Sequence, residues 1–131
     1  MKPLHGVRVL LVEDDDDARE VTRAILEQAG AEVVSVDGAG PAIEALEASP
    51  PQVVVSDLAM PGEDGHAFLR KVRALPRGRG GRIPAVALTA SDSREMRLQS
   101  RDAGFHYHLT KPADPVQLVE IVAALVRLTS R

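Results

Sequence analysis

The chain has 131 residues, 44% of them hydrophobic, with a formal net charge of −3 at pH 7 and no cysteine. This length allows one domain with a single core, and the missing cysteine excludes disulfides, thiolate catalysis and thiolate metal sites. The slight negative charge and the 2% of aromatic residues disfavour nucleic-acid binding. No apolar run approaches the ~20 residues of a membrane span and the start does not resemble a signal peptide, so we expect a cytoplasmic protein that contacts neither nucleic acid nor membrane.

Apolar runs alternate with amphipathic stretches along the whole chain. In chain order we expect a strand at 7–12, a helix at 18–29, a strand at 31–36, a helix at 41–48, a strand at 52–56, a helix at 68–75, a strand at 83–89, a helix at 92–103, a strand at 105–110 and a helix at 115–128. This alternation predicts an α/β fold: a five-stranded parallel sheet, doubly wound with helices on both faces, forming one domain over residues 1–131.

Several polar residues predict where the helices and loops begin. The acidic residues 15–17 are expected to be a solvated cap at a helix start, stabilised by the helix dipole. Asp92 and Glu95 have the spacing of a capping box, and residues 114–115 combine a cap with a proline at the first helical position. Residues 76–82 are basic and rich in glycine, so we expect a flexible loop with solvated arginines.

Five polar side chains fall just at the ends of predicted strands. Glu13 and Asp14 follow the first strand, Asp57 the third, Thr89 ends the fourth and Lys111 follows the fifth. In open parallel sheets these ends meet at one edge, where ligands bind. Clustered carboxylates suit a hard cation such as Mg²⁺, while a hydroxyl and an amine suit phosphate oxygens. Thr89 alone could be an ordinary helix-entry residue and Lys111 a surface lysine, so the prediction rests on the convergence of all these residues at one edge.

The strand-end motifs together resemble the receiver domain of two-component response regulators over essentially the whole chain. The resemblance rests on VLLVEDD (9–15), VVVSDLAMPGEDG (53–65), ALTA (87–90) and HLTKP (108–112), in that order. It implies a flavodoxin-like (βα)5 fold. The segments LHGVRVLLVEDD (4–15) and AGFHYHLTKPADPVQL (103–118) are most similar to receivers at the C-terminus of hybrid histidine kinases. The chain is therefore either such a module or a free-standing regulator.

The resemblance assigns a role to each matching position. It implies that Asp57 accepts a phosphoryl group from a histidine kinase or a histidine phosphotransfer protein, in a reaction that needs Mg²⁺. The metal ligands it implies are Glu13, Asp14, Asp57 and the backbone carbonyl of Ala59. It also implies that the phosphate contacts Thr89, Ala90 and Lys111, and that Ala59 and Ser91 tune hydrolysis. Pro112 stands where the family often has a cis bond. The acidic pair departs from the common pattern, because it is Glu-Asp rather than Asp-Asp.

The second departure concerns the switch position of the family, three residues before the lysine. His108 stands there instead of an aromatic residue, while Thr89 keeps the hydroxyl with which it would act. Tyr107 is expected on the opposite sheet face, and His106 on the same face as His108, which leaves a metal-binding pair as one alternative. His108 either fills the slot or adds a dependence on pH, since imidazole titrates near neutrality.

The last predicted helix carries two apolar stripes. One contains Val116, Val119, Ala123 and Val126, and the other contains Leu118, Ile121, Leu125 and Leu128. One stripe is expected to pack on the sheet; the other is either shielded by neighbouring helices or open to a homodimer or another partner. Because no further domain follows this helix, we expect no fused DNA-binding or enzymatic output.

Three other classes compete with a phosphorylation-switched module. Enzymes that use an aspartyl phosphate usually carry a second acid two residues after the nucleophile, where this chain has Ala59. A degenerate receiver that works without phosphorylation conflicts with the complete acidic, hydroxyl and lysine set. A nucleotide-binding fold lacks its glycine-rich motif after the first strand. We therefore expect a signalling receiver that promotes its own phosphorylation and dephosphorylation, not a turnover enzyme.

Overall fold

Strands and helices alternate along the chain in the computed structural model, which describes residues 2–60, 62–91 and 93–129. The strands are β1 (Arg8–Val12), β2 (Glu32–Val36), β3 (Val53–Asp57), β4 (Ala85–Thr89) and β5 (Tyr107–Thr110). The helices are α1 (Asp16–Gln28), α2 (Ala39–Ala48), α3 (Gly65–Ala74), α4 (Arg94–Ala103) and α5 (Pro115–Thr129), and a short 3-10 helix spans Arg77–Arg79. Each predicted element is present, with bounds that shift by a few residues.

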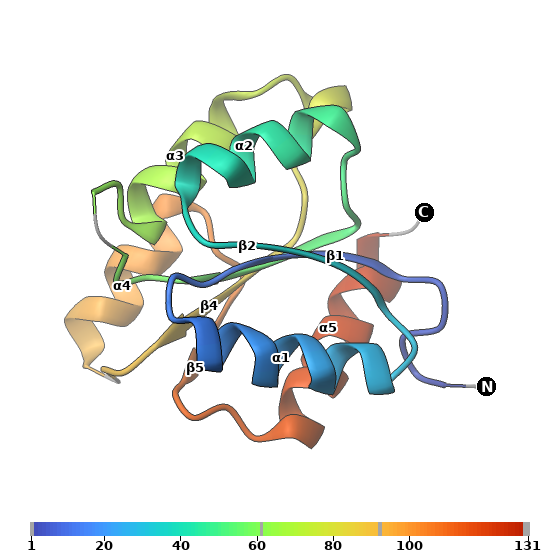
Figure 1. The fold of residues 1–131 in the computed structure, drawn as a ribbon. Helices are drawn as coiled ribbons and strands as arrows, with labels where there is room; N and C mark the ends of the chain where they lie inside the picture. Colours follow the sequence, from blue (N-terminus) through green and yellow to red (C-terminus); the bar gives the residue numbers. More distant parts are fainter. Residues whose placement is uncertain (1, 61, 92, 130–131) are drawn as a thin grey trace.

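The strands form one parallel sheet in the order β2-β1-β3-β4-β5. Helices α1 and α5 cover one face of the sheet, and α2, α3 and α4 cover the other (Figure 1). This order is that of the flavodoxin-like doubly wound fold, so the fold predicted from the sequence is confirmed. All strands point the same way, and their carboxyl ends therefore lie along a single edge of the sheet.

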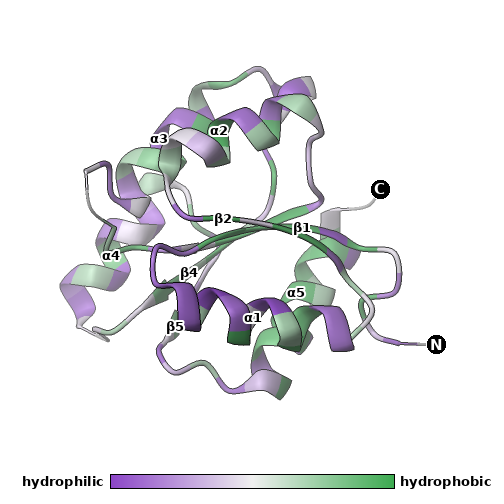
Figure 2. Cartoon of the chain, viewed as in Figure 1, coloured by the Kyte–Doolittle hydropathy of each residue, from purple (hydrophilic) through white to green (hydrophobic). Residues whose placement is uncertain are grey.

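Two layers of apolar side chains fill the space between the sheet and its helices. One layer, under α2, α3 and α4, contains the fully buried Phe68; the other, under α1 and α5, is built from aliphatic residues such as Leu11 and Leu118. The strands β3 and β4 are buried along their whole length. In Figure 2 the strands are mostly hydrophobic in colour, whereas α1 turns a hydrophilic surface outward. Val, Leu, Ile and Ala thus build the core almost without aromatic residues.

The third strand ends one residue later than the sequence predicts, and this places Asp57 inside the sheet. Asp57 pairs with Leu88 of β4, and the Leu58 N–H donates to the Leu88 carbonyl (3.0 Å). The carboxylate of Asp57 is therefore held by the sheet rather than by a loop.

The fourth and fifth strands start later than expected. Before β4, Pro84 supplies only its carbonyl, which accepts from the Val54 N–H (2.9 Å), because proline has no N–H to donate.

The helix caps partly confirm the sequence prediction. Asp15 caps α1 by accepting from the Ala18 N–H (2.9 Å), with exposed acids after it, and Asp114 accepts from the Val116 N–H (2.9 Å) at the start of α5. The capping box at α4 was placed too early. The cap is Ser93, whose Oγ accepts from the Met96 N–H (3.1 Å); the predicted Asp92 lies outside the described residues.

The basic segment 76–82 contains a 3-10 turn that its composition did not predict. Its three arginines are exposed, as expected, but Gly80 and Gly81 are buried. Gly80 has φ +114°, and a Cβ on Gly81 would lie 2.1 Å from the carbonyl oxygen of Leu75. The turn therefore packs closely on the end of α3, and only glycine fits at that contact.

Both apolar stripes of α5 are covered along most of their length. Leu118 is fully buried, as is Val122 between the two stripes, and the rest of both stripes is half-buried in the layer under α1 and α5 except at the helix ends. Val116 is 65% exposed and Leu128 is 71% exposed. Of the two predicted alternatives for the second stripe, shielding by neighbouring elements therefore describes most of it.

His106 connects the beginnings of β4 and β5. Its Nδ1 accepts from the Ala85 N–H (3.1 Å) and lies 3.4 Å from Nη2 of Arg73, while the Arg73 guanidinium donates to the carbonyls of Gly81 and Gly104. Burial and the charge of Arg73 lower the pKa of His106 from its usual 6.5. A proton on Nδ1 would break the bond with Ala85.

Acidification is therefore expected to remove the stability that His106 contributes. Because its pKa is lower in the folded chain, the contribution is present above pH 6.5 and is lost as the pH falls through the lowered value. The His106→Asn variant, whose Oδ1 can replace Nδ1 as acceptor, should lose less stability than wild type between pH 7.5 and 5.5. After solvent screening the difference is a few tenths of a kcal/mol, measured by urea denaturation. Parallel losses in the two proteins would contradict this account.

Candidate functional site

The carboxyl edge of the sheet brings together the side chains that the sequence singled out. Glu13 follows β1, Asp57 is the last residue of β3, Thr89 ends β4 and Lys111 follows β5. Glu13, Asp57 and Thr89 are exposed by only 1%, 4% and 4%. Two acids and a hydroxyl are thus almost fully buried at one edge, where an unpaired charge is costly.

Lys111 joins the two buried carboxylates. Its Nζ lies 2.5 Å from Oε1 of Glu13 and 3.1 Å from Oδ1 of Asp57. The same Asp57 oxygen accepts from the Ala59 N–H (3.3 Å). One ammonium group therefore lies between two carboxylates.

The backbone holds Glu13 so that its side chain points inward. The Glu13 N–H donates to the Val36 carbonyl of β2 (3.0 Å), and Arg19 of α1 donates to the Glu13 carbonyl (2.9 Å). Its Oε2 accepts from the Asp15 N–H (3.3 Å). Asp14 is half-buried beside it. The start of α1 and the neighbouring strand thus fix the acidic pair.

The single ammonium group of Lys111 does not neutralise the charge of the clustered carboxylates, and the pKa of Asp57 is raised as a result. Burial and the neighbouring Glu13 carboxylate raise that pKa from 3.8 to about 7, against the opposing effect of Lys111. Burial alone would lower the pKa of Lys111, but its hydrogen bonds with Glu13 and Asp57 and their charges raise it. The site therefore gains from any additional positive charge that contacts the carboxylates.

The three acids can hold a metal ion. One carboxylate oxygen from each of Glu13, Asp14 and Asp57 lies within 4.8 Å of the others. Hard oxygen donors of this kind suit Mg²⁺, which is commonly held by a few carboxylates and keeps several waters. The donor set and its unbalanced negative charge fit the predicted ion.

Thr89 is held in place from two sides. Its Oγ1 accepts from the Ser91 N–H (3.2 Å), and its carbonyl accepts from the Lys111 N–H (2.7 Å). Ala59 and Ala90 are exposed and Ser91 is half-buried. The peptide bond between Lys111 and Pro112 is cis, as the resemblance implied.

Gly65 contributes to the site in a way that we did not predict from the sequence. A Cβ at this position would lie 2.3 Å from the carbonyl oxygen of Asp57 and 2.9 Å from Cα of Leu58. The Gly65 N–H donates to the Leu58 carbonyl (3.0 Å), which folds the start of α3 against the end of β3. The signal was the glycine that closes the quoted motif after Asp57.

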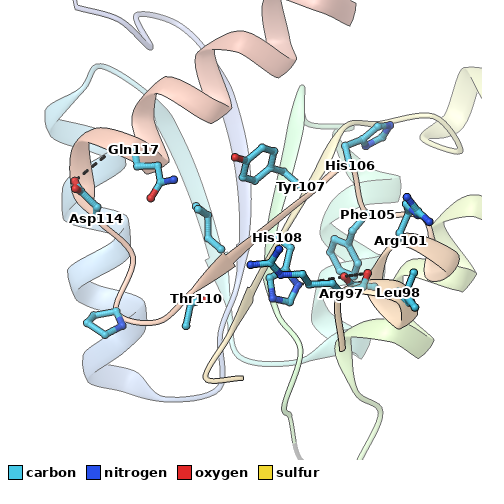
Figure 3. Close-up of a pocket in the computed structure, with 13 residues that line it drawn as sticks. Arg97, Leu98, Arg101, Phe105, His106, Tyr107, His108, Thr110, Asp114 and Gln117 are labelled. Carbon is cyan, nitrogen blue, oxygen red and sulfur yellow. Dashed lines mark hydrogen bonds between the residues drawn. The ribbon is translucent and has the colours of Figure 1, made fainter. Parts of the chain in front are cut away.

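His108 lies on β5 beside α4, and Figure 3 shows its ring next to Arg97 while Tyr107 points away toward α5. Its Nδ1 is 3.3 Å from Oγ of Ser100. The nitrogens of His106 and His108 therefore contact different partners. Among the described residues, the only group of three close metal-binding side chains is the acidic one, so the alternative of a histidine metal site gains no third ligand.

His66, which we did not predict either, lies in the first turn of α3 and is 8% exposed. It lines a cavity with Thr89 and Met96 at the same edge of the sheet. No spacing or motif in the sequence pointed to this histidine.

Comparisons with known proteins agree with this geometry. The pattern of the response regulator receiver domain matches residues 9–123. An uncharacterized 14.6 kDa protein of Leptolyngbya boryana is 41% identical over 122 residues, which cover 93% of this chain and 92% of that protein. The sensor protein GacS of Pseudomonas syringae is 34% identical over 125 residues, covering 95% of this chain and 14% of GacS.

The chain is also similar to a solved structure. The receiver domain of the sensor histidine kinase PA1611 from Pseudomonas aeruginosa PAO1 is 30% identical, with a TM-score of 0.85 over 93% of this chain and 98% of that one. A magnesium ion is coordinated in its active-site cleft.

No helix among the described residues of the present chain combines the length and apolar character that crossing a membrane requires.

Proposed function

Since the chain belongs to the response regulator receiver family, whose members are signalling modules and not turnover enzymes, we propose that Asp57 is its phosphoacceptor. The donor is a phosphohistidine on a histidine kinase or a histidine phosphotransfer protein. The observation that carries this proposal is the position of Asp57: a buried carboxylate at the end of β3, 3.1 Å from Lys111 and within the acidic metal-binding group.

The reaction is an in-line displacement. A carboxylate oxygen of Asp57 attacks phosphorus, the bond between phosphorus and the donor imidazole breaks, and the leaving nitrogen keeps the electron pair and takes a proton from water. Lys111 neutralises charge on the transferred group, and the Thr89 hydroxyl donates to one of its oxygens. When bound, Mg²⁺ supplies further neutralisation of the phosphoryl oxygens. Glu13, Asp14, Asp57 and the carbonyl of Ala59 are the residues that would hold it.

The small residues around Asp57 give the donor and water access. The small side chain of Ala90, which is exposed, leaves room for the incoming phosphoryl group. We assign to Ala59 and Ser91 the tuning of hydrolysis, because Ala59 is exposed and Ser91 is half-buried beside the acids.

Phosphorylation is proposed to act on a face formed by α4, β5 and α5. We propose that the hydroxyl of Thr89, whose oxygen now accepts from the Ser91 N–H, turns toward the phosphate. We propose His108 as the second switch residue. A cavity of about 560 Å³ on this face is lined by Arg97, Tyr107, His108 and Gln117, among others (Figure 3).

A second proposal concerns how this chain is joined to other domains or partners. We propose that residues 1–131 act as one receiver unit, either free-standing or as the receiver of a hybrid histidine kinase. The exposed side chains of Val116 and Leu128 are the parts of α5 that remain available to a homodimer or another partner.

The test is the intact mass of the protein after incubation with acetyl phosphate and Mg²⁺. We expect a gain of about 80 Da, the mass of one phosphoryl group, that disappears with EDTA and in the Asp57→Asn variant. An unchanged mass in wild type, together with no structural response to beryllofluoride, would contradict the proposal and favour a receiver that works without phosphorylation.

A further inference from the structure

Helix α5 carries few charges for a helix at the protein surface. Its 15 residues include only two charged side chains, Glu120 and Arg127, and both are exposed. Leu118 and Val122 face the core, whereas Val116 is 65% exposed on another side of the helix. A surface helix usually carries charged and polar residues on the face opposite its core stripe. The outer face of α5 is instead sparse in charge, and the helix is mostly hydrophobic in colour in Figure 2.

A groove of about 710 Å³ lies between α5 and the end of α1. The two helices contact each other and lie side by side on one face of the sheet (Figure 1). From α5 the groove is lined by both charged residues and by small or β-branched ones, among them Val116, Val119, Ala123 and Ala124. From α1 it is lined by Ile25, Gln28 and Ala29. The groove is therefore an elongated, mainly apolar surface with one acid and one base from α5.

The two charges lie along one line of the helix. Glu120 and Arg127 are seven residues apart, which in an α-helix is about two turns, or ~10 Å, with a drift of only about 20°. The point midway between them falls between Ala123 and Ala124. Small side chains at a crossing point let the axes of two packed helices come close together. The charges of α5 are thus arranged symmetrically, with opposite signs, about a point where another helix can approach.

An antiparallel copy of α5 is complementary to this arrangement. With a two-fold axis at the midpoint, Glu120 of each copy lies level with Arg127 of the other copy, so two ion pairs form. A parallel copy would instead place glutamate beside glutamate and arginine beside arginine, and both contacts would be repulsive. The charge pattern therefore favours a second copy of this chain, in the antiparallel direction, as the occupant of the groove.

We propose that the α1–α5 groove is a self-association surface, on which α5 of a second copy packs antiparallel to α5 and Glu120 of each copy pairs with Arg127 of the other. The exposed Val116 is then covered, along with the half-buried Val119 and Ala123.

This dimer leaves the α4–β5–α5 face open. Gln117 lines the cavity on that face, whereas its neighbour Val116 lines the groove, so the two surfaces are on different flanks of α5. The association involves neither the acids at the sheet edge nor a phosphoryl group. The inference therefore goes beyond the proposed function of Asp57 and does not depend on it.

The first test is sedimentation equilibrium in EDTA at protein concentrations from about 10 µM to about 1 mM. We expect the mass of wild type to approach twice the 14.0 kDa of one chain. Glu120→Arg places arginine opposite arginine in both pairs and should weaken the association by about tenfold or more. The matched control is Glu47→Arg, at an exposed glutamate of α2, which should associate like wild type. Wild type that stays monomeric at the highest concentration, or equal association of Glu120→Arg and wild type, would overturn the proposal.

A charge exchange tests the antiparallel pairing itself. Arg127→Glu alone should also weaken association, because glutamate then faces glutamate. An equimolar mixture of Glu120→Arg with Arg127→Glu restores opposite charges in both pairs, as does the variant that carries both substitutions. We expect native mass spectrometry to show the mixed dimer in the first case and a dimer as tight as wild type in the second. Association no stronger than that of the single variants would overturn the pairing.

The two proposals can fail independently of each other. Asp57→Asn lacks the carboxylate that is proposed to accept phosphate, and it should still associate like wild type in the same sedimentation experiment. A phosphorylated protein that never dimerises would contradict the self-association surface alone. A dimeric protein that is never phosphorylated would contradict the proposed function alone.

Discussion

In metal-free buffer at pH 8, the Asp57→Asn variant is expected to be more stable than wild type by about 2–4 kcal/mol. Wild type keeps a charged Asp57 buried beside Glu13, with Lys111 as the shared cation. The pKa of Asp57 rises from 3.8 to about 7 in the folded chain. The asparagine has a similar shape and no charge, so it removes the repulsion and leaves Lys111 to Glu13.

The stability difference between Asp57→Asn and wild type is expected to depend on pH. The pKa of Asp57 is 3.8 in the unfolded chain and about 7 in the folded chain. Its contribution to the free energy of unfolding is therefore most favourable below pH 3.8 and is lost as the pH rises through about 7. The stability advantage of Asp57→Asn should therefore grow between pH 4 and 7 and then level off. Urea denaturation across this range measures it, with the exposed Asp102→Asn as the matched control. A variant less stable than wild type at pH 8 would refute the account of the site.

The second large effect is expected from Lys111→Met. This change removes the ammonium group that contacts both carboxylates, while the side chain keeps a comparable length. Loss of one donor that stabilises transferred charge typically slows a reaction by about 10²–10³-fold. We expect the rate of phosphorylation by acetyl phosphate at saturating Mg²⁺ to fall by that factor.

The matched control for this variant is Lys71→Met. Lys71 is 61% exposed and pairs with Glu63 at 2.6 Å, away from the acids, and its replacement should leave the rate unchanged. Circular dichroism and Mg²⁺ titration of both variants separate a loss of chemistry from a loss of folding. A Lys111→Met protein that is phosphorylated at the rate of wild type would show that the ammonium group has no part in the reaction.

The sequence predicted the fold because its strand and helix patterns are consistent with one another. The run of three valines at residues 53–55 is short and apolar on both faces, which is typical of a strand covered on two sides, and the structure buries the whole of β3. The strand ends were less certain. Asp57 lies within β3 and not after it because pairing with β4, invisible in local sequence, extends the ladder by one residue.

The residues at the strand ends were predictable, whereas Gly65 and His66 were not. Glu13 and Lys111 follow strands and Asp57 ends one, and the ends of these strands must meet, so topology alone brings the three side chains together. Gly65 acts through the space that a missing Cβ leaves against the Asp57 carbonyl, and His66 acts through burial between α3 and its neighbours. Both depend on tertiary contacts, which composition and spacing do not record.

We expect the transferred phosphoryl group to reside on the carboxylate of residue 57. The most direct measurement is borohydride reduction of the phosphorylated protein, followed by peptide mapping, because an acyl phosphate on aspartate is reduced to the alcohol homoserine while a phosphate ester is not. We predict homoserine at position 57 and nowhere else. Homoserine at position 14, or a phosphate that survives reduction on Ser56 or Ser91, would contradict the claim.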